Sequence, residues 1–261
     1  LIQYNNIGVQ QWIRTFNNGA TDRAIGVVSD NNGLIYVAGR SDNGIDDDYR
    51  VIQYNNAGTI QWNTVYNNAG DDRPSAIEVI PSGGCVITGK SDGNPTTVTD
   101  YNIVTVKYSA SGAQQWVKTY AGTAATEDIP TSLSRNANGE IAVAGNTGLN
   151  SIYNGVSLLY NDAGTNLITQ IYNGGILNDE INGVFATGNG QMVSAGFRGL
   201  TANNREAVLL KYTSNTAPLV STHSGQGDNT DNIRAVASGT NGNLYFCGYT
   251  VYPDSSRDFW V

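Results

Sequence analysis

The chain has 261 residues, with 22 Asp and Glu against 14 Lys and Arg, one His and 31 Gly. Its net charge of −8 disfavours nucleic-acid binding, which depends on a basic surface. No apolar run approaches the roughly 20 residues of a membrane-spanning helix, and no segment keeps a helical period beyond about two turns. The sequence therefore predicts short strands and tight turns, with no nucleic-acid partner and no membrane span.

The predicted strands follow one another in a fixed order along the chain. Residues 1–4 have the pattern of a strand end, and residues 9–16 form the next strand. The first complete repeat has four strands, A to D, at residues 22–30, 34–40, 49–54 and 59–66. Asn32-Gly33 joins A to B, and Asn-Gly is typical of a type I′ turn. The same order returns in four further segments, at approximately 72–120, 128–172, 179–224 and 231–261.

A tyrosine at the end of each strand C marks the repeat: Tyr4, Tyr54, Tyr108, Tyr160 and Tyr212. Four antiparallel strands per period of about 50 residues are typical of a β-propeller blade. The predicted fold is an all-β propeller of five four-stranded blades in a single domain, residues 1–261. The last blade combines residues 231–261 with the N-terminal strands at 1–16. The alternative is a slice of a six- to eight-bladed propeller, since both ends fall within a strand pattern, and we expect a larger polypeptide or assembly.

The repeat resembles a known family. The pattern Asp-x-Ala-x-x-Val-x-x-Asp-x-x-Gly-x-x-Tyr-Val-x-Gly at 22–39 is followed by an Asp-aromatic strand at 48–54 and Gly-x-x-x-Trp at 58–62. This is similar to the bacterial β-propeller repeat family that is named for seven-bladed propellers. The resemblance implies a secreted or surface-attached bacterial protein without assigned catalysis. Five repeats depart from the family's name, and Asn154 and Glu206 replace the Asp that opens strand C.

Each strand A opens with an aspartate: Asp22, Asp72, Asp128, Asp179 and Asp231. One interpretation is structural, because Asp at a strand start accepts hydrogen bonds from nearby backbone N–H groups. The other interpretation makes the five carboxylates a ligand-binding ring at the channel mouth, if strand A is innermost. Neighbouring carboxylates raise one another's pKa unless a cation neutralises them, and calcium (Ca²⁺) accepts such oxygens.

The acidic run at 42–48 is a second candidate calcium site, with Asp42, Asp46 and Asp48 as its metal ligands. This run lacks the full EF-hand spacing and the closing Glu. Calcium is the one cofactor that the sequence suggests.

Most of the carboxylates fall in the B–C and D–A loops or at the strand ends beside them. Strand order places these loops on one face of a propeller. A face of one charge sign attracts cations or basic partners. We expect this acidic loop face to bind a protein or a glycan.

Motifs for catalysis are sparse. His223 is the only His, which disfavours a zinc site and a Ser-His-Asp triad. Glycan cleavage by paired carboxylates needs two different environments, whereas the strand A aspartates look alike, and the doublets Glu127-Asp128 and Asp179-Glu180 are the exceptions. Cys85 and Cys247 are expected to be buried free thiols. The tryptophans, Trp12, Trp62 and Trp116, are expected to pack between blades.

The sequence-based prediction is therefore a non-enzymatic interaction or scaffold propeller, extracellular or on a bacterial cell surface, which presents the acidic loop face in adhesion or protein binding. Two alternatives remain. One is a calcium-dependent carbohydrate-binding domain, and the other is a glycan-cleaving enzyme with acids at the channel mouth.

Overall fold

The structure is a computed structural model. It describes residues 1–93, 100–122, 127–149, 152–175, 177–201, 204–224, 230–239, 242–252 and 256–260. The regular elements in these segments are β strands, with no helix among them, which confirms the all-β prediction. The chain divides into two compact units, residues 1–120 and 121–261, named the N-terminal unit and the C-terminal unit. The boundary falls between the second and third repeats, and the single domain remains a prediction.

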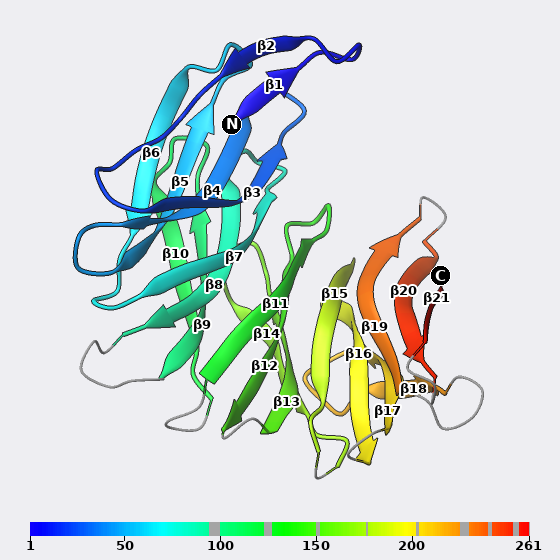
Figure 1. The fold of residues 1–261 in the computed structure, drawn as a ribbon. Helices are drawn as coiled ribbons and strands as arrows, with labels where there is room; N and C mark the ends of the chain where they lie inside the picture. Colours follow the sequence, from blue (N-terminus) through cyan, green and yellow to red (C-terminus); the bar gives the residue numbers. More distant parts are fainter. Residues whose placement is uncertain are drawn as a thin grey trace. The chain divides into compact units, whose positions relative to one another are not determined.

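The N-terminal unit contains three antiparallel sheets (Figure 1). The first pairs β1 (Ile2–Tyr4) with β2 (Gln10–Ile13). The second sheet is β3 (Asp22–Ser29), β4 (Ile35–Asp42), β5 (Asp47–Tyr54) and β6 (Ile60–Tyr66). The third sheet is β7 (Asp72–Val79), β8 (Cys85–Asp92), β9 (Tyr101–Tyr108) and β10 (Gln114–Tyr120). Strand order in each four-stranded sheet follows chain order, as the sequence predicts.

The C-terminal unit repeats this meander (Figure 1). Its first sheet is β11 (Glu127–Arg135), β12 (Ile141–Leu149), β13 (Ile152–Tyr160) and β14 (Asn166–Tyr172). Its second sheet is β15 (Glu180–Gly188), β16 (Gln191–Thr201), β17 (Asn204–Tyr212) and β18 (Leu219–His223). The last sheet has three strands, β19 (Thr230–Ser238), β20 (Leu244–Val251) and β21 (Arg257–Trp260).

A β-bulge at one place in every strand A explains the glycine that lies opposite it near the middle of strand B. The register shifts fall at 24–26, 74–76, 130–132, 181–183 and 233–235. A Cβ on Gly39 would lie 2.5 Å from the carbonyl oxygen of Arg23, too close for any side chain. Gly196 meets the carbonyl oxygen of Glu180 in the same way. A bulge bends the strand and increases its twist, and the opposing glycine lets the two backbones approach.

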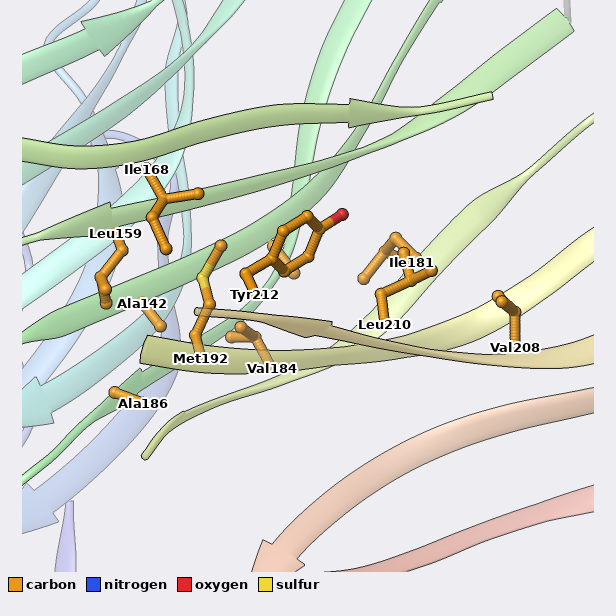
Figure 2. Packing of buried hydrophobic residues seen from close by; sticks show 11 residues of the cluster. Ala142, Leu159, Ile168, Ile181, Val184, Ala186, Met192, Val208, Leu210 and Tyr212 are labelled. Atoms are coloured by element: carbon orange, nitrogen blue, oxygen red, sulfur yellow. The ribbon is translucent and has the colours of Figure 1, made fainter. Parts of the chain in front are cut away.

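Hydrophobic side chains of neighbouring sheets form the core of each unit. In the N-terminal unit, Tyr36 and Tyr49 pack with Ile87 and Val106 of the next sheet, and all four are fully buried. Figure 2 shows the corresponding cluster of the C-terminal unit, in which Met192 points toward Ile168. Alternating residues of each strand supply these contacts, because side chains of a strand point to opposite faces.

The type I′ prediction is wrong for Asn32-Gly33. A positive φ is found at Gly33 alone (77°), and its N–H donates to the Asp30 carbonyl at 3.2 Å. The Asp30 side chain decides the turn, because its Oδ1 accepts the N–H groups of Asn32 and Leu34, both at 2.9 Å. Asp30, two residues before the dipeptide, therefore selects a turn with one left-handed residue.

Asn189-Gly190 does have the two positive φ angles, 57° and 72°, that a type I′ turn requires.

Within the described part of the chain, no helix is long and apolar enough to cross a membrane. Cys85 is buried and free as expected, whereas Cys247 is free and exposed, contrary to the prediction.

Candidate active site

The five strand A aspartates are structural in their contacts. Asp72, Asp128, Asp179 and Asp231 have no exposed surface, and Asp22 is partly buried. Each accepts a hydrogen bond within its own unit: Asp22 Oδ2 from Asn18 N (2.8 Å), Asp72 Oδ2 from Asn68 N (2.7 Å), Asp128 Oδ2 from Gly122 N (2.7 Å), Asp179 Oδ2 from Gly174 N (2.5 Å), and Asp231 Oδ1 from the Thr250 hydroxyl. In the first four, the carboxylate fastens the loop that leads into its strand. A ligand-binding ring of these residues remains a prediction.

Burial changes the acidity of two of these aspartates. It raises the pKa of Asp72 to about 7, against the opposing effect of hydrogen bonds from Ser91 and Asn68. Burial also raises the pKa of Asp179, although the N–H groups of Gly174 and Gly199 oppose it. Such shifts occur at catalytic and at structural sites alike. With no exposed surface, these two carboxyls cannot themselves touch a substrate.

The acidic run at 42–48 folds around the side-chain amide of Asn43. The Asn43 side-chain amide donates to Asp46 Oδ1 at 2.5 Å and to Asp48 Oδ2 at 3.0 Å. Asp42 Oδ1 accepts the N–H of Gly44 at 2.7 Å. Among the residues with a described placement, no three His, Cys, Asp or Glu side chains gather as a metal site. Calcium binding by Asp42, Asp46 and Asp48 stays a prediction.

Two partly exposed carboxylates meet one arginine in the N-terminal unit. Arg73 Nη2 lies 2.5 Å from Asp71 Oδ2, and its Nε lies 3.6 Å from Asp47 Oδ2. Arg40 Nη1 contacts the same Asp47 oxygen at 2.6 Å. The Tyr101 hydroxyl donates to Asp71 Oδ2 at 3.3 Å. Arg40, Asp47, Asp71, Arg73 and Tyr101 are named the Arg73 network.

Two adjacent sheets build the Arg73 network. Arg40 lies late in β4 and Asp47 opens β5, while Asp71 immediately precedes β7 and Tyr101 opens β9. The backbone N–H of Asp47 donates to Asp71 Oδ1 at 3.2 Å, which ties the two sheets together at this end. The strand ends and the loops between B and C and between D and A therefore position the site. Loops on a rigid sheet commonly carry function.

Cations also flank the tyrosine. Lys90 Nζ lies 4.2 Å and Arg73 Cζ 5.8 Å from the centre of the Tyr101 ring. Burial raises the pKa of Tyr101, Arg73 opposes this shift, and the Asp71 carboxylate adds to it. The hydroxyl therefore stays protonated at neutral pH and can donate to Asp71. The side chains of Asp71 and Arg73 are 31% and 40% exposed, so the network is open to a ligand.

A second charged pair, in the C-terminal unit, is closed. Arg198 Nε and Nη2 both contact Glu206 Oε2 at 2.6 Å, and the Ser224 hydroxyl donates to Oε1 at 2.7 Å. Burial favours a higher pKa for Glu206, but the hydrogen bonds from Ser224 and Arg198 outweigh it and lower that pKa. Both carboxylate oxygens are engaged and only 10% of the side chain is exposed, which fits a structural pair.

A cavity of about 210 Å³ lies elsewhere in the N-terminal unit, lined by Phe16, Asp22, Arg50, Ile52 and Tyr54 among others. Ile52 and Tyr54 alternate along β5 with the core residues, so the cavity faces away from that core. It reaches the Arg73 network only at Arg40. Ligand pockets usually exceed about 300 Å³, and the exposed carboxylates of the network are the better candidate for chemistry.

Sequence reasoning missed Asp47, Asp71, Arg73 and Tyr101 as site residues. One signal was present: Asp71-Asp72 is a doublet, whereas Thr21 and Thr230 precede the corresponding aspartates of the first and fifth repeats. Trp12 and Trp62 each reach the next turn, because Trp12 Nε1 donates to the Asn56 carbonyl and Trp62 Nε1 to the Ala110 carbonyl, each at 3.0 Å.

No family model matches the chain, and no curated protein matches it. Solved structures do. The polysaccharide lyase Uly1 shares 12% identity at a TM-score of 0.50, covering 89% of this chain and 56% of that protein. An alpha-L-arabinanase from Penicillium chrysogenum, complexed with arabinobiose, shares 12% identity at a TM-score of 0.46, covering 88% of this chain and 89% of that one. The chain thus spans little more than half the length of the lyase, and the likeness to it is one of fold.

The comparison corrects the functional prediction. The sequence analysis expects a non-enzymatic interaction or scaffold domain, yet the solved structure that the chain resembles at a TM-score of 0.50 is a polysaccharide lyase. That prediction is therefore contradicted, together with the expectation that the chain is not an enzyme. The expected resemblance to a bacterial propeller repeat family has no family model behind it.

Proposed function

We propose that the chain cleaves a glycan and that the Arg73 network is its active site. The observation that carries this proposal is the contact of Arg73 with two partly exposed carboxylates, Asp71 and Asp47. The fold supports it, because the lyase with which the chain shares that fold acts on a polysaccharide. A glycan partner and an extracellular place of action belong to the same proposal.

The network offers the groups that glycan hydrolysis needs. One group must protonate the leaving glycosidic oxygen, and a second must take a proton from water or attack the sugar. Asp71 and Asp47 are the two carboxylates, and their surroundings differ. Asp71 accepts from the Tyr101 hydroxyl and contacts one arginine, whereas Asp47 lies between Arg40 and Arg73. Two carboxylates in unlike environments can take the acid and the base role.

Release of reducing ends from a panel of neutral and uronate-containing polysaccharides tests the proposal. Asp71→Asn and Asp47→Asn each remove one carboxylate and keep the side-chain volume. We expect each to lower the rate by about 10²–10⁴-fold, the usual range for general acid–base catalysis. Asp258→Asn, at an exposed carboxylate in the C-terminal unit, is the matched control and should cleave at the wild-type rate. Wild-type rates in both network variants would refute the assignment.

We also propose the five-blade ring as the architecture that carries this site. Trp12 contacts the turn at 55–58 as Trp62 contacts the corresponding turn at 109–112, which suits β2 as the outer strand of a preceding blade. Val27 is 56% exposed, whereas Ile77, at the same position of the next repeat, is 7% exposed. A further blade that covers Val27 would remove this difference. Small-angle scattering of the intact chain checks the proposal, since an open array has a larger radius of gyration than a closed ring.

A further inference from the structure

We propose that Asp72 is a positioning residue for Asp71, acting through the turn at residues 67–71 that precedes β7. This inference rests on the proposed function, because it assigns Asp72 a role in the geometry of the Arg73 network. Asp72 lies between Asp71 and Arg73 in the chain, and its carboxylate accepts a hydrogen bond from the turn. The Asp72 side chain has no exposed surface.

The side chain of Asp72 binds the backbone of the turn. Its Oδ2 accepts the N–H of Asn68 at 2.7 Å, across four residues. The Asn68 side chain then donates to the Ser91 hydroxyl at 3.2 Å in the neighbouring strand β8. Asp92 N donates to the Asp71 carbonyl at 3.0 Å, which fixes the backbone of the catalytic candidate. Thus the turn is anchored to β8 at both of its ends.

The turn adopts a conformation that its own residues do not favour. Ala69 has a φ of +71°, in the left-handed region that residues with a Cβ rarely occupy. Gly70 lies so close to the Asp92 carbonyl that a Cβ there would collide with it. Backbone strain of this kind persists where surrounding contacts over-determine it, often beside functional sites. The hydrogen bond to Asp72 is one of those contacts.

The corresponding turn of the first repeat, residues 17–21, makes the same two backbone contacts without the acid. Asp22 Oδ2 accepts Asn18 N at 2.8 Å, and Asp42 N donates to the Thr21 carbonyl at 3.0 Å. Thr21 therefore stands where Asp71 stands in the second repeat. The frame is common to both repeats, and the second repeat uses it to present a carboxylate to Arg73. This pair of turns provides a matched control within one unit.

The surroundings of Asp72 make its charge sensitive to pH. The groups that face it from the packed elements are Asp46 and Asp48, Tyr49 of β5, Tyr66 of β6, Ser91 of β8 and Tyr108 of β9. Burial raises the pKa of Asp72 to about 7, and the two carboxylates act in the same direction. A carboxylate accepts a stronger hydrogen bond from an N–H than a neutral carboxyl does. The anchor on Asn68 therefore weakens as the pH falls below about 7.

Hydrogen exchange of the Asn68 amide tests the anchor without an activity assay. Asp72→Asn and Asp22→Asn are compared with wild type between about pH 5.5 and 8, the window around the raised pKa. We expect Asp72→Asn to lower the protection of Asn68 roughly tenfold and to leave Asn18 protected, and Asp22→Asn to do the reverse. In wild type, the protection factor of Asn68 should fall as the pH drops through 7. Unchanged Asn68 protection in Asp72→Asn overturns the inference.

Cleavage of the best polysaccharide of the panel supplies the second readout. Asp72→Asn should lower the rate at least tenfold and abolish the acid limb of the pH profile near 7, while Asp22→Asn retains the wild-type rate and profile. An altered Asn68 amide with unchanged cleavage overturns the positioning role. If wild type cleaves no glycan, the proposed function fails, and the exchange experiment still decides whether Asp72 anchors the turn.

Discussion

Gly112 lies against the indole ring of Trp62, so that a Cβ built on Gly112 would be 2.7 Å from the ring carbon Cδ2. The indole N–H donates to the carbonyl of Ala110 in the same turn, at 3.0 Å. Gly58 meets Trp12 in the same way, with 2.8 Å to Cδ2. A tryptophan in strand D thus covers the C–D turn of the next sheet, which explains why both residues recur in the repeat.

Gly112→Ala should destabilise the N-terminal unit by about 2–4 kcal/mol, because it combines a left-handed φ of 80° with a collision against the indole. Gly8→Ala is the matched control, since Gly8 has the same φ of 80° and no atom within 4 Å of its built Cβ. It should cost about 1 kcal/mol, the conformational part alone. Urea unfolding of both variants measures the difference. Equal decreases in the free energy of unfolding would mean that the Trp62 indole moves aside without destabilising the unit.

Tyr36→Phe should also destabilise the N-terminal unit. The Tyr36 hydroxyl accepts the N–H of Gly84 at 3.1 Å, and both residues are buried. Removal of the hydroxyl leaves that N–H without its acceptor, which costs about 1–3 kcal/mol. Tyr245→Phe, at a site that is 51% exposed, should change the unfolding free energy by less than about 0.5 kcal/mol. Thermal unfolding of the two variants beside wild type gives both values.

The repeat made the strands predictable and concealed the candidate site. Residues such as Asp22 and Gly39 recur because the sheet of each repeat needs them, so their spacing reports the fold. The Arg73 network is not repeated, and it joins residues of two sheets that lie up to 61 positions apart, from Arg40 to Tyr101. A contact of that kind leaves no local pattern. The type I′ prediction for the turn at Gly33 is wrong for a different reason. The Asp30 side chain controls that turn, and the Asn-Gly pattern does not include Asp30.

Asp72 should give the protein a stability that depends on pH. Its folded pKa of about 7 lies above the ordinary value of 3.8, so folding favours the protonated carboxyl. This contribution is fully present below about pH 4 and is lost as the pH rises through 7. The 3.2-unit difference sets an upper limit of about 4 kcal/mol. Asp72→Asn lacks this titration. The free energy of unfolding of wild type should therefore fall relative to that of Asp72→Asn as the pH rises from 4 to 8. A constant difference, measured by urea unfolding, would argue against a raised pKa.

Arg198→Ser should destabilise the C-terminal unit even though it restores a residue that other repeats use. In the strand ladders, Arg198 pairs with Glu206 as Ser41 pairs with Asp48 and Ser91 with Asn102. Serine at 198 would leave the nearly buried Glu206 without its guanidinium, at a cost of about 1–3 kcal/mol, which is less than for a fully buried pair because Arg198 is 31% exposed.

The double variant Arg198→Ser with Glu206→Gln separates lost charge pairing from lost packing. It removes the unpaired charge, so most of the stability should return, and the interaction energy of the double-mutant cycle should exceed about 1 kcal/mol. The lowered pKa of Glu206 adds a pH signature: the contribution of the pair is present above the unfolded pKa and is lost as the pH falls through the folded one. The single variant should therefore differ most from wild type at neutral pH and least in acid. A double variant as unstable as the single one would assign the loss to the arginine's packing.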